Sequence, residues 1–397
     1  MAIRRPRTQS PISRRQFLLR SGALGAAGLS LPPLLAACGG GDSDTAPASG
    51  AVTPADGGGN SLFFENFPVY IDTTADGTLG TVDRFKQATG VDMRYSEAIN
   101  DNNEYFAKIQ PILGTGDTIG PDILVSTGWL TARLIRLGWV DKLPLDRVPN
   151  LANLEDGLKN PTWDPAGEYS LPWQTVLVGI AYNVDATGRD LGSVDDLFDP
   201  ELRGKIGMNT EMRDTMGLLM LGLGIDPSTV TSFNDAAPAF ERLERAKQDG
   251  QIRAFHGNDY FDDLASGNFA ACVGWSGDIL QLTLDNPSLR FVIPEQGGMR
   301  GVDNMVMPRG ARNREAAARW MDFVYDPVQA AQITAAVQYI SPVKGVQEEL
   351  AKIDEALATH PLLFPDAATS ARLNSFADLT EEVEQEFDEA FSRITGA

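Results

Sequence analysis

Short apolar runs alternate with amphipathic stretches along the chain after its first sixty residues. Leu79, Val82 and Phe85 form one apolar stripe at helical spacing, which ends at Gly90, and Gly138 ends a second such stripe. The segments expected to form helices in this way are 79–90, 105–113 and 130–137. The segments expected to form strands are 62–67, 91–95, 123–126 and 271–274. This alternation predicts an α/β fold with mostly parallel sheets covered on both faces.

The beginning of the chain has a different pattern, which is typical of an export signal. Paired arginines in Ser13 to Leu18 precede the uncharged segment 21–37, and Gly and Pro residues interrupt that segment too often for a permanent membrane span. The sequence Leu35-Ala36-Ala37-Cys38 resembles the bacterial lipobox, in which cleavage exposes a cysteine that is then lipidated. We therefore expect 1–37 to be a twin-arginine signal peptide and Cys38 to be a lipid anchor. The alternative is a chance cysteine behind an ordinary signal.

Residues 39–60 are rich in Gly, Ala, Asp and Ser and contain few large apolar groups. Such a composition predicts a flexible tether at 38–60. About 340 residues remain, which is too many for one ordinary core, so two domains are expected. The localisation that follows is periplasmic or cell-surface, with contact to the membrane through the lipid anchor only.

Charge and cysteine content narrow the choice of partners. The formal net charge is −21, and the first 37 residues carry six arginines and no acids, which leaves −27 for the rest. A surface this acidic argues against nucleic acid and anionic lipid, and is compatible with a cationic ligand. The second cysteine, Cys272, stands in an apolar run and is expected to be a buried core residue. No cofactor and no metal site are expected.

Aromatic and hydroxyl residues follow three of the predicted strands. Phe67 stands after the first strand with Tyr70, Thr127 after another with Trp129, and Trp275 after the strand 271–274. Ligands of open parallel sheets bind beyond the carboxyl ends of the strands. These five residues are therefore candidates for a binding site.

Several motifs together resemble the spermidine/putrescine-binding proteins of polyamine ABC importers. The resemblance extends from about Leu62 to the C-terminus. Its motifs are Asn66-Phe67-Pro68-Val69-Tyr70, Pro121 to Val125 followed by Thr127 and Trp129, Tyr169 to Trp173, Leu197 to Lys205, and Gly274 to Gly277. The resemblance implies a type II periplasmic-binding-protein fold, with two α/β lobes joined by a hinge and a polyamine in the cleft between them.

The resemblance also implies roles for particular residues. Its ligand is held between aromatic rings and anchored at its ammonium groups by carboxylates. Carried over to this sequence, the ligand-binding residues are Phe67, Tyr70, Thr127, Trp129, Glu211, Asp214, Trp275, Asp303 and Tyr339. Three positions depart from the family pattern: Phe67 and Gly301 replace tryptophans, with Arg300 beside the second, and Phe376 falls near an expected glutamine.

Domain boundaries follow from the same resemblance. Lobe 1 is expected at 61–181 plus 305–342, lobe 2 at 182–304, and C-terminal helices packing across the lobes at 343–397. We expect the hinge crossings near Ala181 to Val184 and near Asp303 to Met307. The implied partners are a small cationic ligand and the permease and ATPase of an importer, and a monomer is expected.

Each candidate also has a simpler interpretation. Acids such as Glu211 and Asp214 in a first helical turn oppose the helix dipole without any ligand. Tryptophans such as Trp129 and Trp275 more often pack in a core, and we expect Trp139, Trp163, Trp173 and Trp320 to be structural. Arg300 is either a solvated loop residue or an inward charge that would favour a ligand with an acidic group.

Three functions remain open at this point. The chain has only two histidines and lacks a recognisable nucleophile, metal or phosphate-loop motif, so an enzyme is the weakest of the alternatives. The same fold could bind a zwitterionic amine or an amino-phosphonate, with Arg300 contacting the anionic end. It could also serve as a sensor subunit without transport. The apolar stripe Leu379, Val383, Phe387 and Phe391 predicts a C-terminal helix that packs on its own domain.

Overall fold

The computed structural model describes residues 60–75 and 78–396. The predicted signal peptide, Cys38 and most of the tether lie outside these residues, so they stay predictions. No helix among the described residues is long and apolar enough to span a membrane.

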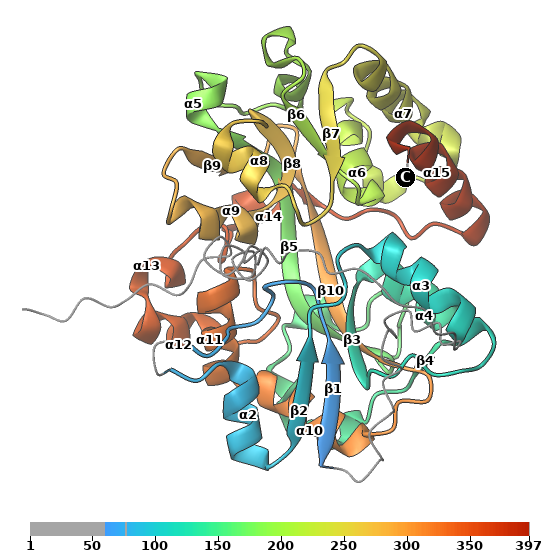
Figure 1. Ribbon diagram of the computed structural model, residues 1–397, viewed down its shortest axis with the longest axis vertical. Helices are drawn as coiled ribbons and strands as arrows, with labels where there is room; N and C mark the ends of the chain where they lie inside the picture. The colour runs from blue at the N-terminus through green and yellow to red at the C-terminus, as the bar shows by residue number, and fades with distance from the viewer. Residues whose placement is uncertain (1–59, 76–77, 397) are drawn as a thin grey trace, which may run out of the picture.

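One continuous sheet runs through the molecule, as Figure 1 shows, with helices on both of its faces. Its main strands follow the order β2-β1-β3-β10-β5-β8-β6-β7, and off this path β4 and β11 pair with β10 while β9 pairs with β5. The strands are β1 Ser61–Glu65, β2 Asp92–Ser96, β3 Ile123–Thr127, β4 Val140–Asp141, β5 Ser170–Asn183, β6 Ile206–Asn209, β7 Ile252–His256, β8 Ala271–Trp275, β9 Leu289–Val292, β10 Gly298–Pro308 and β11 Leu373–Asn374. Strands β1, β2 and β3 pair in parallel at one end, and β6, β7 and β8 do so at the other. The predicted fold class is confirmed.

The helices alternate with the strands, as the apolar pattern indicated. They are α2 Thr81–Thr89, α3 Asn102–Gly114, α4 Gly128–Arg136, α5 Val184–Thr187, α6 Met212–Gly222, α7 Phe233–Gln248, α8 Phe261–Ser266, α9 Ser276–Thr283, α10 Arg314–Val324, α11 Pro327–Val337, α12 Val346–Ile353, α13 Glu355–Ala358, α14 Ala367–Ser370 and α15 Glu381–Thr395. Short 3₁₀ turns are η1 Leu145–Arg147, η2 Pro149–Asn153, η3 Asp156–Leu158, η4 Val194–Phe198, η5 Pro200–Leu202 and η6 Pro227–Thr229. Gly90 ends α2 in the left-handed conformation at φ 71°, which glycine adopts without steric cost.

Two long antiparallel strands, β5 and β10, connect the lobes. Leu171 and Trp173 of β5 belong to the core of lobe 1, whereas Val178 and Ile180 belong to that of lobe 2. From Val178 onward β5 also pairs with β8. The strand of 14 residues therefore contributes to both cores, and it passes from one to the other between Trp173 and Val178. Bending at either crossing stays a prediction.

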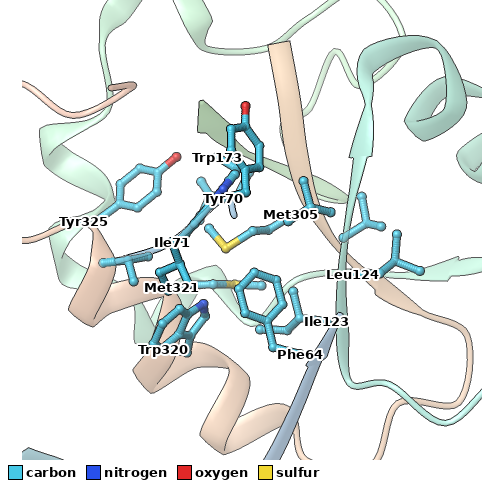
Figure 2. Packing of buried hydrophobic residues seen from close by; sticks show 14 of the residues in the cluster. Phe64, Tyr70, Ile71, Ile123, Leu124, Trp173, Met305, Trp320, Met321 and Tyr325 are labelled. Atoms are coloured by element: carbon cyan, nitrogen blue, oxygen red, sulfur yellow. The ribbon is translucent and has the colours of Figure 1, made fainter. Parts of the chain in front are cut away.

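The core of lobe 1 is rich in aromatic rings (Figure 2). Phe64 contacts both Trp173 and Trp320, at ring-centroid distances of 5.6 and 5.5 Å. The tryptophans themselves stack at 6.4 Å, and both are buried. Each aromatic pair stabilises the fold by about 1 kcal/mol beyond the contribution of its buried area. The structural role expected for Trp173 and Trp320 is confirmed.

The core of lobe 2 is formed around α6, whose side chains are almost all buried. Phe387 of α15 contacts Phe233 at 5.6 Å and Phe240 at 5.3 Å, between ring centroids. The C-terminal helix thus packs on its own protein through its apolar stripe, as predicted. Residues 346–363 contribute to the core of lobe 1 instead, so the C-terminal region contacts both lobes. Cys272 is fully buried, as expected.

Candidate ligand-binding site

A cavity of about 200 Å³ lies between the two lobes. Its lining includes residues at or after the carboxyl ends of β1, β3, β6 and β8, where a ligand of a parallel sheet is expected, together with residues of β5 and β10. All nine residues expected at the site line this one cavity: Phe67, Tyr70, Thr127, Trp129, Glu211, Asp214, Trp275, Asp303 and Tyr339. Contact between these residues and a ligand stays a prediction.

Asp303 supplies a carboxylate from β10, next to an irregularity in the pairing of β10 with β5. Its side chain is buried, and the Tyr70 hydroxyl donates a hydrogen bond of 2.7 Å to Oδ2. Burial raises the pKa of Asp303 to about 7, and the charge of Asp214 adds to this effect. A buried carboxylate without a cation therefore takes up a proton near neutral pH.

Glu211 and Asp214 supply two more carboxylates where β6 leads into α6. Glu211 stands at the N-cap of α6 but makes no side-chain cap bond, and Asn102 Nδ2 donates to its Oε2 at 3.3 Å. Trp275 Nε1 donates to Asp214 Oδ2 at 2.8 Å. Burial raises the pKa of Asp214 to about 6, and burial together with the charge of Asp214 raises that of Glu211 well above its ordinary value.

Tyr70 and Tyr339 form one aromatic wall of the cavity. Their rings meet edge to face at 5.1 Å, and Phe67 contacts Tyr70 at 5.9 Å. The Tyr339 hydroxyl donates to Asp278 Oδ1 at 2.6 Å, while its ring lies against Gly277. A Cβ at Gly277 would stand 2.6 Å from that ring, so only glycine permits this approach.

Trp129 occupies a different environment from the other rings. Two guanidinium groups lie over it, those of Arg133 at 4.7 Å and Arg213 at 4.6 Å from the ring centroid. These distances are those of cation–π contacts. The ring of Trp129 is therefore already shared with cations of the protein itself. Thr127, before it, has a buried hydroxyl with no partner among the described residues.

Some residues of the cavity were not predicted from the sequence. Trp163, expected to be structural, lies against Gly128 and lines the cavity. Asn102 follows the carboxyl end of β2, and the rule that found Phe67 and Thr127 would have found it as well. Nothing in the sequence around Arg213 indicated that its side chain would be buried beside the two acids.

Gly301 and Arg300 lie at the exposed part of the cavity lining. A Cβ built on Gly301 has no atom within 4 Å, so the position has room for a larger side chain. Arg300 adds a positive charge near the opening. That this pair departs from the family pattern stays a prediction from the sequence.

The lobes contact each other beside the cavity. Thr210 of lobe 2 donates to Asp101 Oδ2 of lobe 1 at 3.2 Å, and Asn258 Nδ2 donates to the carbonyl of Asn100 at 2.8 Å. Asn102 to Glu211 is a third such bond. The structure thus shows the lobes in contact through the segment Asn100 to Asn102. Within residues 60–75 and 78–396, no three His, Cys, Asp or Glu side chains form a group suited to a metal ion.

This geometry, two α/β lobes that enclose a cavity at their strand ends, defines a binding protein with an interdomain cleft. Residues 80–365 match the family described as bacterial extracellular solute-binding proteins, and the chain belongs to that family.

Individual relatives support the assignment. The chain is 27% identical over 330 residues to the putrescine/cadaverine-binding protein of Pseudomonas aeruginosa. The aligned region covers 79% of this chain and 89% of the relative. It is 24% identical over 311 residues to the spermidine/putrescine-binding periplasmic protein of Escherichia coli, covering 78% and 84%. The solved substrate-binding protein of a spermidine/putrescine ABC transporter from Streptococcus pneumoniae is 22% identical and superimposes with a TM-score of 0.69, covering 85% of this chain and 99% of that one. The last similarity shows the fold alone.

Proposed function

We propose that this protein captures a polyamine, putrescine or spermidine, in the cleft and delivers it to an ABC importer. The observation that carries the proposal is the set of three buried carboxylates in one cavity. Asp303, Asp214 and Glu211 form no salt bridge with any lysine or arginine that the structure describes, and the pKa of each is raised. Buried acids are costly unless a cation compensates them. A ligand with ammonium groups supplies that cation.

The walls of the cavity suit the rest of a polyamine. Tyr70, Tyr339, Phe67 and Trp275 offer apolar surface to the methylene groups, each of which contributes about 0.8 kcal/mol when buried. Ammonium–carboxylate hydrogen bonds are of the stronger, charge-assisted kind. Less the cost of association, the sum is compatible with micromolar affinity, about −8 kcal/mol. The names of the Pseudomonas and Escherichia relatives support the same ligand class.

The anchoring and the partners belong to the same proposal. Export by the twin-arginine route and lipidation at Cys38 would keep the protein, as a monomer, beside the permease and ATPase that it serves. The site functions as a binding site without catalysis. The sequence motif at Cys38 and the tether after it support this part.

Calorimetry of the soluble form, residues 61–397, tests the ligand. Putrescine and 4-aminobutyrate form a matched pair of four carbons each, because one terminal aminomethyl group of the first is replaced by a carboxylate in the second. We expect micromolar binding of putrescine or spermidine and none of 1,4-butanediol, which has the length without the charge. No binding of putrescine, spermidine or spermine at millimolar concentration would overturn the proposal.

Arg300 favours a second candidate, a zwitterionic amine. It lines the cavity at its opening, where it could pair with a carboxylate or phosphonate of the ligand. Binding of 4-aminobutyrate that is tighter than that of putrescine, and that is lost in Arg300→Gln, would decide for this candidate. Binding of putrescine that is unchanged in Arg300→Gln supports the polyamine.

A further inference from the structure

A buried acid of the C-terminal helix contacts arginines from both lobes. Glu384 of α15 is 5% exposed. Its carboxylate accepts hydrogen bonds from Arg213 Nη2 at 2.6 Å, Arg136 Nη2 at 2.7 Å and Arg133 Nε at 3.2 Å. One turn further along, Asp388 accepts from Arg133 Nη2 at 2.8 Å. We call these five residues the arginine cluster.

The arginine cluster joins elements that belong to different lobes. Arg133 and Arg136 project from α4, which packs in lobe 1, whereas Arg213 belongs to α6 of lobe 2. Helix α15 packs on lobe 2 beside α7, with α4 across the cleft from it (Figure 1). The ion pairs from Glu384 to α4 can therefore form only while the lobes are in contact.

The same cluster reaches the candidate site through Arg213. This arginine stands in sequence between Glu211 and Asp214, its side chain is buried, and its guanidinium lies over Trp129. Its positive charge lowers the pKa of both neighbouring acids, although burial raises these pKa values further. Glu384 is the one ion-pair partner of Arg213 among the described residues, so without Glu384 the charge of Arg213 would act on Glu211 and Asp214 with no anion paired to it.

We propose that Glu384 is a positioning residue for ligand capture. In its first role Glu384 neutralises Arg213, so that Glu211 and Asp214 stay available to a cationic ligand. In its second role it stabilises the contact between the lobes through its ion pairs with Arg133 and Arg136. The first role rests on the proposed polyamine function; the second does not. A cluster with only a structural role would change stability when altered and leave ligand affinity alone, because removing one partner of a buried ion pair leaves the other charge buried and uncompensated.

Affinity measurements on variants that each remove a charge test the first role. Glu384→Gln keeps the shape of the side chain and removes its charge, and Glu386→Gln makes the same change at an exposed position of the same helix. We expect Glu384→Gln to weaken putrescine or spermidine binding about tenfold or more, and Glu386→Gln to leave it unchanged. The double variant Arg213→Gln/Glu384→Gln should regain most of the loss, since no cation then competes for the site acids. Wild-type affinity in Glu384→Gln, or no recovery in the double variant, would overturn the first role.

X-ray scattering of the ligand-free protein tests the second role independently of any ligand. Glu384→Gln and Arg136→Gln both remove ion pairs between the lobes, and Arg136 is partly exposed, so its loss leaves the core intact. We expect a larger radius of gyration in both variants than in Glu386→Gln. If the wild-type protein binds no polyamine, the proposed function fails and scattering alone decides the interlobe role. Variants with the wild-type radius would overturn it.

Discussion

Two groups of buried acids lie on either side of Arg213, and they behave in opposite ways. Burial raises the pKa of Glu384, but the charges of Arg213 and Arg133 outweigh burial, and its pKa is lowered. Glu211 is equally buried, and its pKa is raised well above the ordinary value because no counter-charge outweighs its burial. Burial alone therefore does not identify a binding site. The acids of the cavity differ from Glu384 in two respects together: they form no salt bridge among the described residues, and their pKa values are raised.

The largest effect is expected from removing one of the uncompensated acids. Asp303→Asn keeps the shape of the side chain and the Tyr70 contact but removes the charge that the ligand would pair with. We expect polyamine affinity to fall by about 2 kcal/mol or more, roughly thirtyfold in Kd, measured by calorimetry. Asp285→Asn, an exposed position, is the control. Equal affinity in the variant and the control would show that Asp303 does not contact the ligand.

The same substitution should act on stability in the opposite direction. An acid whose pKa is raised in the folded state binds its proton more tightly there, so its cost is absent below pH about 3.8 and grows as the pH rises to about 7. The ligand-free wild-type protein should therefore lose stability relative to Asp303→Asn between pH 5 and pH 8. Urea denaturation of both proteins at the two pH values measures this difference.

Asp303→Asn is the necessary reference in that experiment, because a second buried group also changes stability with pH. Burial lowers the pKa of His256 to about 4, so its contribution to stability is lost as the pH falls below about 6.5. His256 titrates in the same pH range as Asp303, but its effect on stability has the opposite sign. This effect is the same in the wild type and in Asp303→Asn, so it cancels in their difference. A difference between wild type and Asp303→Asn that does not change with pH would contradict the raised pKa of Asp303.

How far the sequence led to this site depends on the kind of contact. The strand ends and the family motifs brought Phe67, Thr127 and Trp275 to one cavity, because the position of a residue after a parallel strand is a local property. Arg213 and Glu384 were not predicted as a pair, since they are 171 residues apart and meet only through the packing of α15.

A smaller effect is expected in the pH dependence of binding. Without ligand, Asp303 and Asp214 are protonated in part near neutral pH, with pKa values of about 7 and about 6. A bound ammonium lowers these values, so binding releases protons, and affinity should rise by about tenfold from pH 5.5 to pH 8. Calorimetry in two buffers that differ in ionisation enthalpy measures the number of protons released on binding. Binding enthalpies that agree in both buffers would mean that the acids are already ionised.

The smallest expected effect tests Gly301, one of the positions where the sequence is expected to depart from the family pattern. Gly301 lines the cavity with open space in the direction of a side chain, and its φ is not in the left-handed region that would exclude other residues. Gly301→Trp should place an indole beside Asp303, where a cation–π contact is worth about 0.5 to 1 kcal/mol at an exposed site. We therefore expect affinity for putrescine to rise about threefold, with Gly301→Ala as the control for the loss of glycine. An unchanged or weaker affinity in Gly301→Trp alone would mean that Arg300, not the missing ring, governs this end of the cavity. The double variant Arg300→Gln/Gly301→Trp would then recover the gain, because the competing charge has been removed.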